Sequence, residues 1–521
     1  MISILVMAVK GALVLFGSVY LFATLLRKED AAWVKRAPLM MFTGLFVIGM
    51  LGHTVWVPYL ALMFSIPLLS KTRPDAAALF AVAIACLPAM ETTQHVGAVY
   101  LFSFTKWLFA SLGLAIAFII RPGTGPVLRR RFDLPFLIVL GLAIAYARDP
   151  KGTETLRQLI PVFLQTGLAY WLISRSLNTV EEMRRFVLAI ALAGFVMAIV
   201  VIVEAKLHWM MYKSMEAALG VETQINQFEK MRGGIIRAPG AFAEATSLGL
   251  YLAVAGVATL SLRDTFASRH KFYFAVFMIV VGMFAPNSRG AFIGIGVGVL
   301  AYDLYKGRIG ALVIKAAVGG LLYTILQTLA QFSTYFATLA GKGGVESSTD
   351  YRFLLLHRGL EEIRKHPVAG TNIKAALNHL EDIRQGEGII DLVNGYITYG
   401  LVLGFPGIVG LVMVFLTMVG AMLAIRSRIR VDPVLWQLGA FVFSVALFMS
   451  LASFYTGFGG QNSTPFYEVL ALGSVIWAAS RTALAPQHVA GEHSAPPAPS
   501  GIRAMIQADR LRAKALGSTA P

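Results

Sequence analysis

The chain has 521 residues, of which 57% are hydrophobic and only 14% are charged. Soluble domains carry roughly 25% charged residues, and a water-facing globule of this size cannot bury so many apolar side chains. The formal net charge is +17, but the basic residues lie between apolar runs, so the charge does not indicate nucleic-acid binding. The composition excludes a soluble enzyme, a secreted scaffold and a disordered chain, and it predicts a polytopic membrane protein.

Apolar runs follow one another along the chain at a length that suits helices crossing a bilayer. A helix needs about 20 apolar residues to cross the hydrocarbon core, and these runs are continuous rather than alternating with a period of two. We therefore expect an all-α, polytopic helical membrane bundle of about 12 to 15 spans. The single cysteine, Cys86, lies inside an apolar run and is expected to pack there. The expected spans are 4–26, 37–52, 53–70, 76–90, 97–120, 132–147, 157–176, 186–204, 241–262, 272–285, 290–305, 309–331, 392–425, 433–456 and 463–480.

The runs and their connections divide the chain into five expected parts. Most of the last part is rich in Ala, Pro and basic residues, so we expect a disordered tail, with a membrane-surface helix as the alternative. The parts are N-terminal membrane helices in 1–131, central membrane helices in 132–331 with an exterior loop at about 205–240, a large loop in 332–391, C-terminal membrane helices in 392–480, and the tail in 481–521.

The distribution of Lys and Arg predicts which side of the membrane each connection faces. Cytoplasmic connections carry an excess of these residues. If 27–36 is cytoplasmic, most of the basic residues in short connections fall on that side, together with the C-terminal tail. The large loop 332–391 then lies on the exterior side. If 37–70 is instead one kinked span, the N-terminus is cytoplasmic as well.

The large loop is long for a protein whose other connections are short, and such loops are usually functional or disordered. Apolar residues recur at helical spacing between Tyr351 and Lys365, and Pro367 then ends the pattern. A helix with an apolar stripe in this loop favours a functional role.

Two arginines stand at the exterior ends of apolar runs. Arg289 interrupts what would otherwise be a continuous helical hairpin, and Arg237 precedes the next run on the same side. A guanidinium in this setting must reach headgroups, a carboxylate or a bound anion, and a snorkelling side chain that ends a span is the structural alternative. Because paired guanidiniums suit phosphate oxygens, we interpret the two residues as a pyrophosphate clamp.

Four separated features resemble the superfamily of O-antigen ligases and O-antigen polymerases, membrane glycosyltransferases that act on undecaprenyl-diphosphate-linked sugars. The segment 237–249 resembles the family's Arg-containing entry to a span, and the Asn-Ser-Arg-Gly turn at 287–290 resembles its Ser-Arg-Gly turn. Arg352 followed by His-Pro-Val-Ala-Gly at 366–370 is similar to its large-loop pattern. The stretch 393–407, Val-Asn, nine residues and Gly-Phe-Pro-Gly, is similar to its ligase signature. The resemblance covers roughly residues 180 to 480.

The resemblance implies a bacterial inner-membrane glycosyltransferase with a cytoplasmic C-terminus and a periplasmic large loop. Val393 stands where the ligase signature has the His that is proposed to activate the acceptor, and valine can neither accept a proton nor bind phosphate. This departure favours a polymerase of repeat units in O-antigen or exopolysaccharide synthesis. The alternatives are ligase-type transfer of finished glycan to lipid A-core or protein, and a polysaccharide transporter or flippase, which usually shows internal repeats and mid-membrane charge.

The implied reaction needs cations for the leaving diphosphate and a base for the acceptor hydroxyl. The cations expected at the catalytic site are Arg237, Arg289 and Arg352. The candidate bases are Glu244 and, in the large loop, His379 and Asp391. Asp350 and Glu387 are further candidates in the large loop. Glu244 shares a helix face with Arg237 if the helix has begun by that arginine, and its alternative role is a helix N-terminal carboxylate.

The expected partners are those of a lipid-linked pathway. They are an undecaprenyl-diphosphate-linked oligosaccharide donor, a glycan acceptor and membrane lipids, with a chain-length regulator and a flippase as further candidates and no nucleic acid. The large loop contains no HExxH or DxD pattern, so we expect metal-independent chemistry and no cofactor.

Overall fold

The computed structural model describes residues 2–96, 99–125, 127–129, 131–221, 231–232, 235–340, 342, 348–384 and 390–482. The predicted tail therefore lies almost entirely outside the described residues, as do parts of the exterior loop at 205–240 and of the large loop. Met1–Ala479 form one compact unit, and everything that follows concerns that unit.

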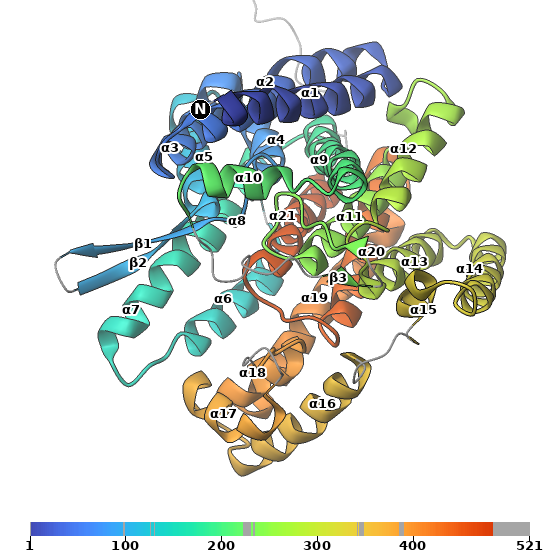
Figure 1. Cartoon of the computed structure of the whole chain (residues 1–521). Coiled ribbons are helices and arrows are strands. Elements are labelled where there is room, and N and C mark those ends of the chain that lie inside the picture. The colour runs from blue at the N-terminus through green and yellow to red at the C-terminus, as the bar shows by residue number, and fades with distance from the viewer. Residues whose placement is uncertain are drawn as a thin grey trace, which may run out of the picture. The chain divides into compact units, whose positions relative to one another are not determined.

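Helices make up nearly all of its regular structure (Figure 1). Among the described residues six helices are long and apolar enough to cross a membrane, and shorter apolar helices pack beside them. The predicted all-α membrane bundle is thus confirmed as a fold class. The long helices are α1 (Ile2–Leu25), α2 (Lys28–Leu51), α9 (Val180–Leu207), α14 (Ile309–Leu329), α19 (Phe405–Ile429) and α20 (Pro433–Ala452). The shorter ones are α3 (Trp56–Leu69), α5 (Lys106–Ile120), α6 (Leu134–Tyr146) and α11 (Ala245–Ser261).

The remaining elements connect or cover these helices. Two short antiparallel pairs, β1 with β2 and β3 with β4, are the strands of the described residues. The helices are α4 (Arg73–Ala83), α7 (Gly152–Pro161), α8 (Leu168–Ser176), α10 (Met211–Ala218), α12 (Arg269–Gly282), α13 (Arg289–Lys306), α15 (Thr334–Ala340), α16 (Ser348–Lys365), α17 (Ile373–His379), α18 (Gly395–Leu403) and α21 (Gly460–Thr482). The other elements are β1 (Glu91–Val96), β2 (Val99–Thr105), β3 (Met231–Arg232), β4 (Ile235–Ile236), the π-helix η1 (Val162–Gly167), and the short 3₁₀ helices η3 (Arg263–Thr265) and η4 (Glu381–Ile383).

Two predicted boundaries are wrong in the first part of the chain, whereas the prediction of two separate spans in 37–70 is confirmed. The expected connection 27–36 is almost wholly helical, because α2 already begins at Lys28 with acidic residues in its first turn, where the helix dipole favours them. The stretch 37–70 contains two helices, α2 and α3, rather than one kinked helix. The expected span 97–120 is helical only from Lys106, because its first part pairs as β2 with the Thr-containing strand β1.

The expected span 392–425 is also two helices, which break at Gly404. This residue has φ 70°, and a Cβ there would lie 2.4 Å from the carbonyl oxygen of Pro367. The amide of Phe405 donates to that same carbonyl at 2.8 Å. The break between α18 and α19 therefore holds the large loop against the bundle, which requires glycine at this position.

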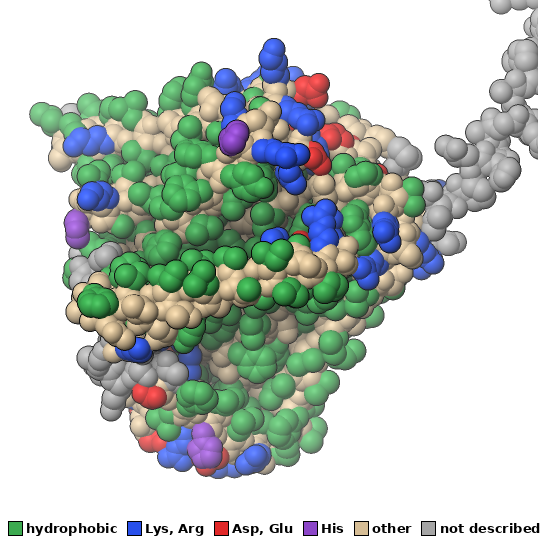
Figure 2. Space-filling view, turned by 90° about the vertical axis from the view of Figure 1, so that its right-hand side faces the viewer, with side chains coloured by type: hydrophobic (Ala, Val, Ile, Leu, Met, Phe, Trp, Pro, Cys, Tyr) green, Lys and Arg blue, Asp and Glu red, His purple; other side chains and the backbone are tan. Residues whose placement is uncertain are grey.

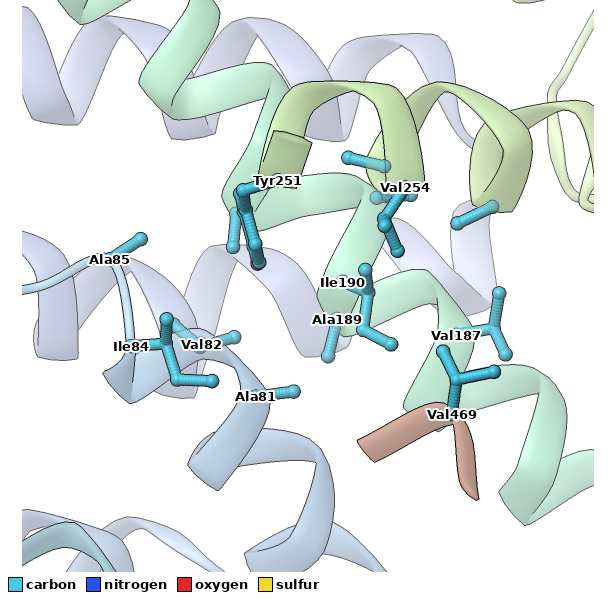
Figure 3. Close-up of a cluster of buried hydrophobic side chains, with 14 of the residues drawn as sticks. Ala81, Val82, Ile84, Ala85, Val187, Ala189, Ile190, Tyr251, Val254 and Val469 are labelled. Atoms are coloured by element: carbon cyan, nitrogen blue, oxygen red, sulfur yellow. The ribbon is translucent and has the colours of Figure 1, made fainter. Parts of the chain in front are cut away.

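Two hydrophobic clusters of different size stabilise the chain. The larger one joins α4, α9, α11, α20 and α21, and Figure 3 shows Val82, Ile190, Val254 and Val469 among its buried side chains. The smaller cluster is formed by the large loop with α18 and includes Leu355 and Ile397. The outer surface also carries many apolar side chains, as Figure 2 shows for one face and as α14, none of whose residues is buried, illustrates. Such a surface suits a multi-pass protein surrounded by lipid.

Candidate functional site

The turn before α13 positions the first two arginines. Arg237 Nε donates to the carbonyl oxygen of Pro286 at 3.1 Å, and its Nη2 donates to Thr246 Oγ1 at 3.3 Å. The amide of Ala238 adds a hydrogen bond to Ala285 O at 3.3 Å. Segments that lie about fifty positions apart in sequence thus meet at one turn. This turn ends two residues after Asn287, whose φ is 47°, at the start of α13.

Arg289 is the first residue of α13, and its Nε donates to the carbonyl oxygen of Thr338 on α15 at 3.0 Å. The neighbouring Gly290 has the Tyr455 ring directly against it, because a Cβ there would lie 2.3 Å from a ring carbon. Tyr455 Oη also donates to the carbonyl oxygen of Gly290 at 3.0 Å. The close approach requires glycine, and it places the α20–α21 connection beside Arg289.

Arg352 comes from the large loop, near the beginning of α16. Its Nε is buried and has no hydrogen-bond partner among the described residues. Burial lowers the pKa of Arg352, and the positive charge of Arg289 lowers it further, whereas Asp391 and Tyr455 act in the opposite direction. Arg352 therefore lies within electrostatic reach of Arg289 and of the Tyr455 hydroxyl.

Arg237 is coupled to the same group of charges. Burial lowers the pKa of Arg237, Glu244 raises it, and Arg352 lowers it again. The structure thus brings Arg237, Arg289 and Arg352 together, and no ion pair of any of the three is found within the described part of the chain. Gathered like charges repel one another, and a bound anion with several oxygens would relieve this repulsion.

Two of the candidate bases lie close to this arginine cluster, as we call Arg237, Arg289 and Arg352. Glu244 is exposed and occupies the N-cap position of α11, which begins at Ala245. The condition for a helix face shared by Glu244 and Arg237 is therefore not met, because Arg237 lies before the start of α11. Asp391 is exposed, and its amide donates to Tyr351 Oη at 2.9 Å while its carbonyl accepts from the same hydroxyl at 3.0 Å.

His379 lies at the other end of α16 from Arg352. Its Nδ1 is 2.6 Å from Glu362 Oε1, and Glu362 also accepts from Lys365 Nζ at 2.8 Å. Glu362 follows Arg352 by ten residues, which corresponds to about 15 Å along a helix axis. The described contacts therefore group His379 with a structural ion pair, whereas Glu244 and Asp391 are grouped with the arginines.

Two further candidates carry less information. Asp350 is exposed in the first turn of α16, and Glu387 lies outside the described residues. Val393, at the position of the signature His, packs against the smaller hydrophobic cluster. Among the described residues no three His, Cys, Asp or Glu side chains come together as metal ligands would.

Tyr455 is the site residue that sequence reasoning missed. It lies in the connection between two apolar helices and belongs to no recognisable motif, and its role depends on Gly290, which is 165 positions away. Only the Gly after Arg289 gave a signal, because a glycine next to a conspicuous charge suggests a close approach.

Comparison with known families bears on this region. Residues 274–412 match the family model described as O-antigen ligase, and no curated protein matches the chain significantly. The matched stretch contains Arg289, Arg352, Asp391 and Val393, whereas Arg237 precedes it. The resemblance to the superfamily is thereby confirmed over this stretch. Residues 274–412 are thus similar to the O-antigen ligase family, and this likeness supports the superfamily of O-antigen ligases and O-antigen polymerases for this part of the chain.

Proposed function

We propose that the chain polymerises undecaprenyl-diphosphate-linked oligosaccharide repeat units at the periplasmic face of the bacterial inner membrane, with its C-terminus in the cytoplasm. The arginine cluster carries this proposal. Three guanidiniums meet there from a loop, a helix start and the large loop, and their described hydrogen bonds go to backbone carbonyls and a threonine rather than to carboxylates. A diphosphate offers the several anionic oxygens that such an arrangement lacks.

The reaction follows from this geometry. An acceptor sugar hydroxyl attacks the anomeric carbon of the lipid-linked sugar, the bond between that carbon and the diphosphate oxygen breaks, and the hydroxyl proton passes to a carboxylate. The departing diphosphate gains negative charge, which the positioned guanidiniums stabilise without any requirement for a metal ion. Glu244 and Asp391 are the carboxylates that act on the arginines, so we assign the base to one of them.

The choice of a polymerase rests on Val393. This side chain packs among the apolar residues of the smaller cluster, so no imidazole acts at the position where a ligase carries its signature His. The second candidate is a ligase that transfers finished glycan, and the description of the matching family model favours it. A transporter is the weakest alternative, because the three clustered arginines lie in a loop, at a helix start and in the large loop rather than along a path through the helices.

Deletion of the gene, followed by analysis of lipid-linked sugars, separates these candidates. Accumulation of single repeat units is the result expected of a polymerase, and its partners would then include a flippase and a chain-length regulator. Accumulation of long, unattached chains would instead assign the ligase activity. Unchanged glycans would overturn both assignments.

A further inference from the structure

A cavity of about 530 Å³ lies among α5, α6, α7, α8, α18 and α21. This volume falls within the range of roughly 300–1,000 Å³ that small-molecule sites occupy. None of the three clustered arginines lines it. Its walls combine aromatic rings with amide and hydroxyl groups, and the residues that matter below are Trp107, Tyr146, Gln158, Gln165, Tyr399 and Glu468.

Glu468 is the unusual group in this cavity. Its side chain is only 1% exposed, and neither carboxylate oxygen has a hydrogen-bond partner among the described residues. The hydroxyl of Tyr251, on the adjacent α11, is also buried without a described partner and lies within electrostatic range of Glu468. Burial of a carboxyl without hydrogen bonds is costly, and nearly all buried polar groups in proteins have partners. A ligand that donates hydrogen bonds would remove this cost.

The other walls indicate what kind of donor fits. The rings of Tyr146 and Tyr399 lie 5.5 Å apart, and those of Tyr399 and Phe458 lie 6.3 Å apart. They form an aromatic wall, which offers flat apolar surface to the C–H faces of a sugar ring. Gln158 and Gln165 add carboxamides, which both donate and accept hydrogen bonds. Arg157 also lines the cavity, and its charge is paired with Glu154 at 3.2 Å. Aromatic rings, amides and one buried carboxyl group therefore match a hydroxyl-rich, uncharged ligand.

The cavity also adjoins the arginine cluster through one short segment. The α20–α21 connection carries Tyr455, whose hydroxyl bonds to Gly290 beside Arg289, and it also carries Phe458, which lines the cavity. The amide of Gly395, at the start of α18, donates to Ser453 O at 2.7 Å in the same connection. A ligand in the cavity and a diphosphate at the arginines would therefore both lie beside this connection.

We propose that this cavity binds the acceptor saccharide, with Glu468 accepting hydrogen bonds from its hydroxyl groups. The assignment of the ligand as the acceptor rests on the proposed glycosyltransferase function. The binding itself is independent of that function, because an uncharged oligosaccharide needs no contact with the arginines.

The test measures binding to the purified full chain in detergent, with Trp107 fluorescence and calorimetry as readouts. The first probe is a set of neutral oligosaccharides made by partial acid hydrolysis of the source bacterium's own polysaccharide, and the second is inorganic pyrophosphate. Glu468→Leu should weaken oligosaccharide binding at least about tenfold, because it leaves hydroxyl groups of the bound ligand without a hydrogen-bond partner in the cavity. It should leave pyrophosphate binding unchanged.

Matched variants separate the two proposals. Glu29→Gln, at an exposed position of α2 outside the cavity lining, should bind both probes as the unmodified chain does. Arg289→Ala should no longer bind pyrophosphate but should still bind the oligosaccharide. Unchanged pyrophosphate binding by this variant would contradict the arginine clamp and would not bear on the saccharide proposal. If Glu468→Leu does not fold, Gln165→Leu serves in its place with the same expectation.

Three results would overturn the saccharide proposal. They are no oligosaccharide binding by the unmodified chain, equal binding after Glu468→Leu, and a Glu468-dependent response to methylammonium with none to the oligosaccharides. The last result would assign the cavity to a cationic ligand instead.

Discussion

Charged side chains near the two ends of α16 differ in their hydrogen bonds. Near its C-terminal end Arg358 donates to Asp382 at 2.8 Å, and Glu362 accepts from both Lys365 and His379. Near its N-terminal end the guanidinium of Arg352 has a buried Nε without a described partner. Both ends belong to one helix in one loop, so local sequence preference does not explain the difference.

We expect the charges at the C-terminal end of α16 to stabilise the fold and Arg352 at its N-terminal end to take part in the proposed diphosphate binding. At the C-terminal end of α16, which we call the paired end, ion pairs connect the helix to α17 and η4. Each of these ion pairs contributes little stability at an exposed position. At the N-terminal end of α16, which we call the unpaired end, Arg352 lies near Arg289 and Tyr455. Burial and the positive charge of Arg289 both lower the pKa of Arg352. A protein retains such an unfavourable group when it serves function, because stability alone would select a paired or apolar residue.

The largest expected effect is the loss of activity when an arginine at or beside the unpaired end is replaced. Arg352→Ala or Arg289→Ala should lower polymer formation by about 100-fold or more, because each removes a donor to the leaving diphosphate. The measurement is polymer yield in cells that lack the gene and carry each variant, with membrane levels of the protein compared by immunoblot. Arg358→Ala, at the paired end of the same helix, is the control and should retain activity. Normal polymer in Arg289→Ala would remove the clamp.

The next largest effect concerns the base. Replacing the correct carboxylate by its amide should lower the transfer rate by about 100-fold or more, since general bases commonly contribute that much. We expect this from either Asp391→Asn or Glu244→Gln, measured with a lipid-linked donor in proteoliposomes. His379→Gln should have a small effect, because His379 contacts Glu362 at the paired end. A severe loss in His379→Gln with normal rates in both amide variants would reverse this assignment.

A smaller effect is expected from the glycine beside Arg289. In Gly290→Ala the new Cβ would lie 2.3 Å from the Tyr455 ring, so the ring must move, and overpacking of this kind typically costs about 1–3 kcal/mol. The expected result is a lower thermal midpoint together with reduced activity. Gly296→Ala is the matched control on the same helix, because no atom lies within 4 Å of its added Cβ, and it should behave like the unmodified chain. Equal midpoints for the two variants would contradict this account.

The sequence predicted features that depend on local pattern. Hydropathy located most of the apolar helices, and the spacing of apolar residues predicted the helix that became α16, which ends at Lys365 just before His366 and Pro367. The isolation of Arg289 in apolar sequence pointed to an unusual charge for the same reason. Each of these signals is contained within about twenty consecutive residues.

Features that depend on pairing between distant segments were not predicted. Strand β2 looked like the start of a helix because most of its residues are apolar, and apolar content does not distinguish a strand from a helix. Arg237 and Glu244 do not share a helix face because α11 begins only at Ala245, and nothing in the sequence indicated this start. The importance of Tyr455 and Glu468 depends on their positions in the fold, so no spacing along the chain identifies them.

The smallest expected effect is a pH dependence at the paired end of α16. Burial raises the pKa of Glu362, but hydrogen bonds from Lys365 and His379 outweigh it, and the net shift lowers the pKa. A carboxyl whose pKa is lower in the folded state stabilises that state above its unfolded pKa of about 4.3, and this contribution is lost as pH falls through the folded value. Hydrogen exchange of the α16 and α17 amides should therefore accelerate as pH is lowered below about 4, once corrected for intrinsic rates. Glu362→Gln should remove most of that dependence, and an unchanged dependence in this variant would show that another group holds this end of the loop together.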